Sequence, residues 1–193
     1  MNRRWIGWAI GLSVWGQAIA ASARPAEVFQ AHLGQIRQEL PSHYVLRLPS
    51  EILLGGPGMS PDEMNQLIVK VLPASTPPRL TISLFTCNSS PYPCLVGSFS
   101  VESVTSQNAQ RELLSHQRFN APITLAEGVR GYLREGSALN PPSDFSSVMW
   151  QQDQMIYTVS FLATERQNIL YMARSMANQP PILSMQVPTA SGK

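Results

Sequence analysis

Two strand-like runs on either side of a short loop restrict the fold more than any other feature of the sequence. Residues 80–86 and 95–101 are rich in β-branched, aromatic and other apolar side chains. The six residues between Cys87 and Cys94 are all turn formers except Tyr92. This pattern predicts a β-hairpin, and therefore an antiparallel pairing of the two runs.

The N-terminal segment has the three-part arrangement of a secretory signal peptide. The chain opens on two arginines, continues with an apolar stretch over residues 5–16 and then passes through mostly small residues up to Ala23. We expect cleavage after Ala23, with Ala20 as the alternative. The prediction is an exported, soluble protein in a periplasm, a thylakoid lumen or the extracellular space.

Three alternatives concern the same segment. Residues 5–23 are just long enough to remain as an uncleaved membrane anchor. The pair Arg3 and Arg4 is compatible with twin-arginine export, although the residues around it match that signal poorly. A lipoprotein anchor is not expected, because no cysteine follows the small residues.

The charge of the exported part excludes one large class of partner. Removal of residues 1–23 takes away two arginines and no acid, so 14 basic against 12 acidic residues becomes 12 against 12. A neutral domain lacks the net charge that attracts nucleic acid or an anionic membrane surface over long range. We expect one domain over residues 24–183, followed by a disordered tail over residues 184–193.

The only two cysteines are predicted to form a disulfide, Cys87 to Cys94, because export places them in an oxidising compartment. A redox pair is the alternative, but the spacing differs from Cys-x-x-Cys. A zinc site is disfavoured, because no histidine lies within thirteen residues of either cysteine.

Hydrophobic periodicity predicts the remaining elements. In the N-terminal half we expect an amphipathic helix over residues 25–40, a strand over 43–48, a turn at 55–58, a helix start at 60–63 and a strand over 67–72.

The C-terminal half alternates between the same kinds of element. We expect a helix over residues 107–117 with Leu113 and Leu114 facing inward, strands over 123–126 and 129–135, a hairpin of 147–150 with 155–161, and a last helix capped by Thr164 and Gln167. Strands joined by hairpins, with helices at the start, middle and end, predict an α+β fold in which helices cover an antiparallel sheet.

Candidate chemical groups are scattered. His32, His43 and His116 lie on different elements without any catalytic or metal-binding motif, so we interpret each as a surface or packing residue. The glycines at 55–58 precede a helix start, but Pro57 removes a backbone donor and no Gly-Lys-Ser/Thr ending follows, which favours a plain turn over a phosphate site.

Two further groups were weighed as binding residues. Four aromatic side chains are predicted to fill the core between the sheet and the last helix rather than to line a groove: Tyr132, Trp150, Tyr157 and Phe161. Four arginines are predicted to be solvated, as candidates only for the rim of a docking surface: Arg130, Arg134, Arg166 and Arg174.

The segments 148–159 and 165–176 combine a strand with Trp150, a turn, a strand with Tyr157 and a closing helix that ends in Ala-x-Ser-Met. In this arrangement the chain resembles the C-terminal part of small exported bacterial domains of unknown function. More loosely, the order of elements is similar to PsbP-like proteins, the extrinsic photosystem II subunits. The resemblance implies a non-enzymatic accessory domain, with a cyanobacterial periplasm or thylakoid lumen as one location, and it transfers no catalytic or metal residue.

Two functional hypotheses follow. The first is an exported accessory or binding module without cofactor, whose partner is a protein, a peptide or a lipid, and which meets the membrane only during export. The second is a small exported hydrolase with a serine nucleophile activated by His43 or His116.

Overall fold

The structure of this protein is a computed structural model that describes residues 24–55, 66–88 and 94–185. The predicted signal peptide, most of the turn at 55–58, the helix start at 60–63 and the tail from residue 186 lie outside the described residues. Among the described residues, no helix combines the length and the apolar character needed to cross a bilayer.

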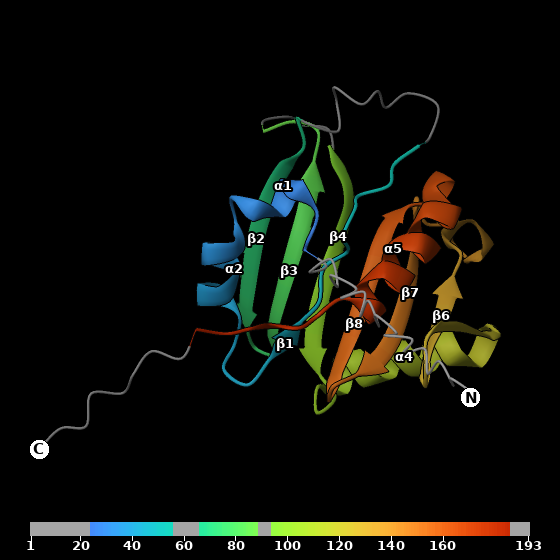
Figure 1. The fold of residues 1–193 in the computed structure, drawn as a ribbon. Coiled ribbons are helices and arrows are strands. Elements are labelled where there is room, and N and C mark those ends of the chain that lie inside the picture. The colour runs from blue at the N-terminus through green and yellow to red at the C-terminus, as the bar shows by residue number, and fades with distance from the viewer. Residues whose placement is uncertain (1–23, 56–65, 89–93, 186–193) are drawn as a thin grey trace, which may run out of the picture.

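The fold is α+β, as predicted, and is built on one antiparallel sheet of seven strands (Figure 1). The strand order is β2-β3-β4-β8-β7-β6-β5. Strands that are adjacent in the sheet are therefore consecutive in the chain, except β4 and β8. The strands are β2 (Ile68–Ser75), β3 (Pro78–Phe85), β4 (Leu95–Ser103), β5 (Pro122–Ala126), β6 (Val129–Arg134), β7 (Phe145–Gln152) and β8 (Met155–Leu162).

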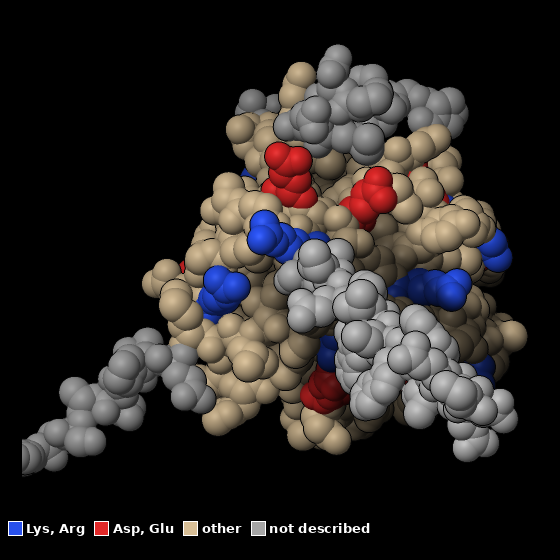
Figure 2. All heavy atoms as spheres, in the orientation of Figure 1, with Lys and Arg blue, Asp and Glu red and all other residues tan. Residues whose placement is uncertain are grey.

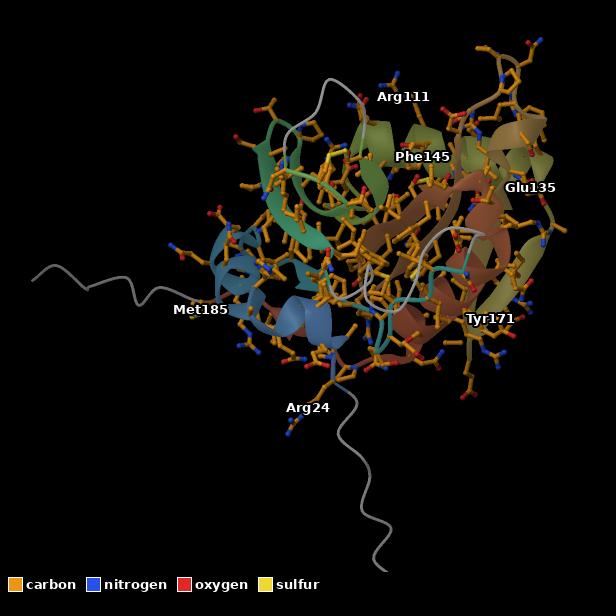
Figure 3. All side chains as sticks on the ribbon, turned by 90° about the horizontal axis from the view of Figure 1, so that it is seen from above. Arg24, Arg111, Glu135, Phe145, Tyr171 and Met185 are labelled. Atoms are coloured by element: carbon orange, nitrogen blue, oxygen red, sulfur yellow. A yellow bond between two sulfur atoms is a disulfide. The ribbon has the colours of Figure 1, made fainter. Side chains whose placement is uncertain are left out.

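Helices lie on both faces of this sheet. One face carries α1 (Glu27–Gln30), α2 (Leu33–Glu39), α5 (Arg166–Asn178) and a small sheet of β1 (Val45–Leu46) with β9 (Ile182–Leu183), whereas the opposite face carries α4 (Gln107–Phe119) (Figures 1 and 3). Two short 3-10 turns complete the fold: Gly136–Ala138 precedes β7, and Ala163–Glu165 connects β8 to α5.

The main core fills the space between the sheet and α1, α2 and α5. At its centre the Phe99 ring lies edge-on to Phe29, at 5.7 Å between ring centroids, and to Phe161, at 5.2 Å. A smaller apolar cluster joins α4 to the other face through Ala109, Leu113, Met149 and Ile156. Because strand side chains alternate between faces, these two clusters fix the direction of every strand side chain.

The hairpin of β7 and β8 is confirmed, and its turn is tighter than its sequence suggests. Gln152 pairs with Met155, so only Asp153 and Gln154 form the turn, and both have positive φ, 51° and 61°. A two-residue turn with this backbone twist matches the twist of the flanking strands.

Near the N-terminus the predicted elements are shortened. The single helix expected over residues 25–40 is two short helices separated at Ala31 and His32, and the strand expected over 43–48 pairs only at Val45–Leu46. Phe29 on the first of these helices and Ile36 on the second are both fully buried in the core.

Two details of the later helices were predicted wrongly. Leu113 faces the sheet, but Leu114 is 61% exposed, because successive helical residues are turned by about 100° and cannot both face inward. The last helix begins at Arg166 after a 3-10 turn, so Thr164 and Gln167 do not form its cap. Instead the buried carboxylate of Glu165 accepts hydrogen bonds from the Gly55 N–H and from Asn168.

Candidate functional site

Hydroxyl side chains form two adjacent rows on the face of the sheet that carries α4. The row through the middle of the sheet pairs Ser83 with Ser98, and Ser98 with Ser160. The next row pairs Thr81 with Ser100, and Ser100 with Thr158. We call this surface the hydroxyl face, and it consists of Thr81 and Ser83 on β3, Ser98 and Ser100 on β4, and Thr158 and Ser160 on β8.

The direction of these side chains follows from their neighbours. Leu80, Ile82, Phe99 and Val159 belong to the main core on the opposite face, so the residues between them point away from that core. α4 packs against β6, β7 and β8 on this side, and none of the described helices lies over β2, β3 or β4 there (Figure 3). Ser83 is buried by its neighbours and the other five hydroxyl residues are half-buried.

Charged side chains lie at the border of the hydroxyl face rather than within it. On β2 the Lys70 ammonium lies 4.7 Å from the centroid of the Phe85 ring. At the other end, Arg79 and Glu102 form an ion pair of 3.9 Å. The six residues of the face are therefore neutral donors and acceptors, with the Lys70 cation on one side and the Arg79–Glu102 ion pair at one end.

An apolar hollow adjoins the face at the end of β7 and β8. It has a volume of about 520 Å³ and includes Leu95, Phe145 and Leu162 in its lining. Phe145, labelled in Figure 3, is the first residue of the interior strand β7. Along the strands in this direction, the hydroxyl face is therefore followed by apolar side chains.

The row of Ser83, Ser98 and Ser160 continues beneath α4 and ends at a buried histidine. Ser160 pairs with Ser147 on β7, and the Ser147 hydroxyl lies 2.8 Å from Nε2 of His116. Nδ1 of His116 lies 2.9 Å from the Glu112 carbonyl, which can only accept, so Nδ1 carries the proton and Ser147 donates to Nε2. Burial lowers the pKa of His116, and the positive charge of Arg134 lowers it further.

This pair has the hydrogen bond of a serine nucleophile with its base, but not the surroundings. β7 is paired on both sides, Ser147 with Ser160 of β8 and with Arg134 of β6. Backbone N–H groups around Ser147 therefore face neighbouring strands, whereas an oxyanion hole needs free donors beside the nucleophile. The arrangement satisfies a buried imidazole and offers no evident stabilisation of an acyl-transfer intermediate.

The other predicted histidines do not join it. His43 is exposed in the turn before β1, with φ of 68°, and His32 is half-buried at the start of α2. Of the two bases predicted for a serine nucleophile, His116 contacts a serine hydroxyl, whereas for His43 no such contact is seen among the described residues. Among the described residues, no group of three or more His, Cys, Asp or Glu side chains is arranged to hold a metal ion.

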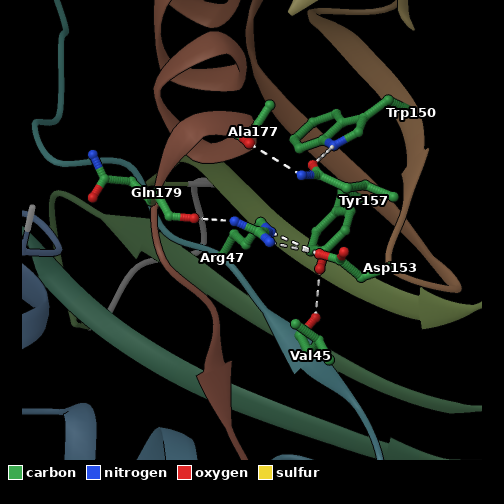
Figure 4. A network of polar contacts seen from close by, with 8 residues as sticks. Val45, Arg47, Trp150, Asp153, Tyr157, Ala177 and Gln179 are labelled. Carbon is green, nitrogen blue, oxygen red and sulfur yellow. Dashed lines mark hydrogen bonds and ion pairs between the residues drawn. The ribbon is translucent and has the colours of Figure 1, made fainter. Parts of the chain in front are cut away.

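A second polar cluster lies at the opposite face, where β1 and the segment after α5 meet the turn between β7 and β8 (Figure 4). The Arg47 guanidinium contacts the Asp153 carboxylate, with Nη2 at 2.7 Å and Nε at 2.9 Å from Oδ2, and also donates to the Gln179 carbonyl. The Tyr157 hydroxyl donates to the Val45 carbonyl at 2.7 Å. Burial raises the pKa of Tyr157, so the phenol remains a neutral donor.

The same cluster extends to the end of α5. Gln152 donates to the Ala177 carbonyl at 3.1 Å and accepts from the Trp150 indole at 3.2 Å. The Trp150 ring stacks on Tyr157 at 5.2 Å. These contacts connect β1, the β7–β8 turn and the chain after α5, which is a structural role.

The aromatic and basic residues singled out from the sequence divide between the faces. Trp150, Tyr157 and Phe161 are fully buried in the main core, as predicted, whereas Tyr132 packs beside α4 in the smaller cluster, which corrects its predicted place. The arginines are exposed at 130, 166 and 174 and half-buried at 134. The face seen in Figure 2 shows single Lys, Arg, Asp and Glu side chains with uncharged surface between them.

Cys87 and Cys94 lie at disulfide distance at the ends of β3 and β4, with their Cα atoms 5.6 Å apart. The Thr86 N–H donates to the Cys94 carbonyl at 3.0 Å and continues the strand pairing up to the two cysteines. The hydroxyl face was missed from the sequence. Its signal was the alternation of Ser or Thr at 81 and 83, at 98 and 100, and at 158 and 160.

Comparison with family models, with curated proteins and with solved structures finds no match to this chain.

Proposed function

We propose that this chain is an exported, non-enzymatic accessory module that binds a protein partner through the hydroxyl face. The observation that carries the proposal is the register of six Ser and Thr side chains on three adjacent strands that no described helix covers on that side. Each hydroxyl can donate and accept, so the face offers many hydrogen bonds to a polar protein surface. The half-buried rows hold these groups on a rigid sheet rather than on loops.

The chemistry of the face favours a neutral partner surface. Its six residues carry no charge, the flanking Arg79 is paired with Glu102, and the Lys70 ammonium at the border lies over the Phe85 ring. A phosphate or a nucleic acid is bound largely through cations, and none of the six residues of the face supplies one. The neutral balance of 12 basic and 12 acidic residues after removal of residues 1–23 supports the same choice.

Export and compartment belong to the proposal. The signal-like start of the chain and the cysteine pair at disulfide distance support an oxidising location outside the cytoplasm. The location that we propose is a periplasm or thylakoid lumen, which the resemblance to PsbP-like proteins implies. Intact-mass measurement of the exported protein, with and without reductant, tests the cleavage site and the disulfide together.

Position-specific crosslinking in the native compartment tests the binding surface. A photoreactive phenylalanine analogue replaces Ser100, at the centre of the hydroxyl face, or Tyr171 on α5, which is 54% exposed on the opposite side of the sheet (Figure 3). We expect a discrete adduct from position 100, none from position 171, and loss of the adduct when Thr81→Lys is added. Equal adducts from both positions, or none from position 100, would contradict the proposal.

A serine hydrolase is the second candidate, and the contact of Ser147 with His116 is the observation that favours it. Among the described residues, His116 is the histidine that hydrogen-bonds a serine hydroxyl. A fluorophosphonate probe should label Ser147 if this candidate is right, with loss of labelling in Ser147→Ala and His116→Ala. A binding module predicts no label at Ser147.

A further inference from the structure

The outward side of α4 carries apolar and cationic side chains together. Arg111, Leu114, Ser115, Arg118 and Phe119 recur at helical spacing and line one shallow hollow of about 240 Å³. We call these five residues the α4 ridge. Ala109, Leu113 and His116 are the buried residues of the helix, so the ridge points away from the sheet.

The apolar members of the ridge are unusually open to solvent. Phe119 is 77% exposed and Leu114 is 61% exposed, the two highest values among the large apolar side chains described. Single exposed apolar residues are ordinary on protein surfaces. Two of them on one helical side, next to two guanidinium groups, form the amphipathic combination that marks an interaction site.

The cations of the ridge have no carboxylate partner among the described residues. The ion pairs among the described residues join other arginines: Arg47 with Asp153, Arg79 with Glu102, and Arg166 with Glu135. Arg111 hydrogen-bonds instead to Asn108 and to the Gln107 carbonyl of its own helix.

One acid borders the ridge. Glu112 lies about 100° around the helix axis from Arg111, and its exposed side chain is next to Ser115 and Phe119, three and seven residues further along the helix. Beyond Phe119 a larger hollow of about 620 Å³ brings in the Arg134 side chain, and Glu135 at the same hollow is bound to Arg166 at 2.5 Å. Arg111, Arg118 and Arg134 thus outnumber the single acid Glu112, and the surface along the helix and past its C-terminal end has a net positive charge.

We infer that the α4 ridge docks on an anionic lipid bilayer, with Phe119 and Leu114 entering the interface while Arg111 and Arg118 contact the lipid headgroups. α4 is the helix that stands on this side of the sheet, and Arg111 extends outward from it (Figure 3). Long arginine stems let the guanidinium stay at headgroup level while neighbouring apolar groups insert.

The size of the ridge favours a bilayer over a protein partner. A stable protein interface buries about 800 Å² on each partner, spread over roughly twenty residues. Five residues on one helix are far fewer, whereas bilayer attraction accumulates with each basic and apolar residue at the interface. This inference goes beyond the proposed function and stands on other residues, so either can fail without the other.

Vesicle cosedimentation tests the inference on the chain from Arg24 to Lys193, which contains every described strand and helix and omits the signal-like segment. Vesicles of phosphatidylcholine alone are compared with vesicles that contain about one third phosphatidylglycerol. We expect binding only to the anionic vesicles, and its loss at high salt. Each of Arg111→Gln and Arg118→Gln should lower the partition coefficient about fivefold, and Phe119→Ser should lower it several-fold.

Matched control variants lie on the opposite side of the sheet. Tyr171→Ser and Arg174→Gln change an exposed aromatic and an exposed arginine on α5 and should leave vesicle binding unchanged. The ridge variants are at exposed positions, so their unfolding midpoints should match that of the unchanged chain. Equal binding to neutral and anionic vesicles, or equal loss in ridge and control variants, would overturn the inference. If the ridge variants bind vesicles unchanged but lose the protein adduct formed from position 100, the ridge contacts a protein instead of a bilayer.

Discussion

His116 Nε2 accepts a hydrogen bond of 2.8 Å from the Ser147 hydroxyl, which joins the last turn of α4 to the middle of β7. The imidazole is fully buried, and its other nitrogen donates to the Glu112 carbonyl. Both ring nitrogens therefore have partners, which is the condition for burying a polar ring between helix and sheet. Substitutions at Ser147 and His116 distinguish a structural hydrogen bond from a catalytic nucleophile with its base.

Ser147→Ala should destabilise the protein by about 1–3 kcal/mol, because it leaves Nε2 of a buried histidine without a donor. Urea unfolding at neutral pH measures the change. Ser98→Ala, in the same row of the sheet, is the control and should change the free energy of unfolding by less than about 0.5 kcal/mol. An equal effect of the two variants would mean that the hydrogen bond to His116 contributes nothing to stability.

Acidification should destabilise the protein through His116. Burial holds its pKa below the ordinary value of 6.5, so near and below pH 6.5 the unfolded chain binds a proton that the folded chain does not. The free energy of unfolding should fall as the pH drops through this window, by at most about 1.4 kcal/mol per pH unit, and the contribution should level off below the folded-state pKa.

His116→Gln supplies the control for this pH dependence, since an amide does not titrate. Unfolding curves between about pH 7.5 and pH 5.5 should have a smaller pH slope in the variant than in the unchanged chain. Identical slopes would show that groups other than His116 produce the dependence.

Asp153→Asn should destabilise the protein by about 1 kcal/mol, because Arg47, whose side chain is only 13% exposed, loses its charged partner. Asparagine tolerates the positive φ of 51° at this turn position, so the backbone of the hairpin is preserved. Glu135→Gln breaks the more exposed pair with Arg166 and should change stability by less than about 0.5 kcal/mol. Thermal unfolding of the two variants side by side decides whether the more buried pair matters more.

Gly97→Ala should destabilise the protein by about 1–3 kcal/mol, because a Cβ at this position would overlap the ring of Phe161 on the paired strand. Gly34→Ala is the opposite case: nothing lies within 4 Å of its Cβ position, and alanine in α2 should stabilise by up to about 1 kcal/mol. Chemical denaturation measures both. In Gly97→Ala with Phe161→Leu the loss should be smaller than the sum of the single losses, and simple additivity would contradict the steric reason.

Elements with strong local patterns could be predicted from the sequence. The hairpin of β3 and β4 and that of β7 and β8 were recognisable because alternating apolar residues flank turn formers. The end of the helix predicted over residues 25–40 was also recognisable, but its break at Ala31 was not. Apolar residues such as Phe29 and Ile36, seven positions apart, lie on one face of a continuous helix as well, so their spacing does not indicate a break.

The candidate site was less accessible to sequence reasoning, because it depends on register and on layers. Alternation of Ser and Thr at 98 and 100 shows that both point to the same side of a strand, but not which strands lie beside it. Leu114 illustrates the second difficulty, since its neighbour Leu113 is equally apolar and only the position of the sheet decides which of them is exposed.

The sequence by itself determined the α+β class and the main hairpins, because alternation and turn chemistry act over a few residues. Only the tertiary structure decided that β4 lies beside β8, which places Ser98 next to Ser160 and extends the row to Ser147 and His116. It also decided that Phe119 and Leu114 face solvent on the outer side of α4. The physical reason is that strand order and helix docking are set by burial of the whole apolar surface, which no local pattern contains.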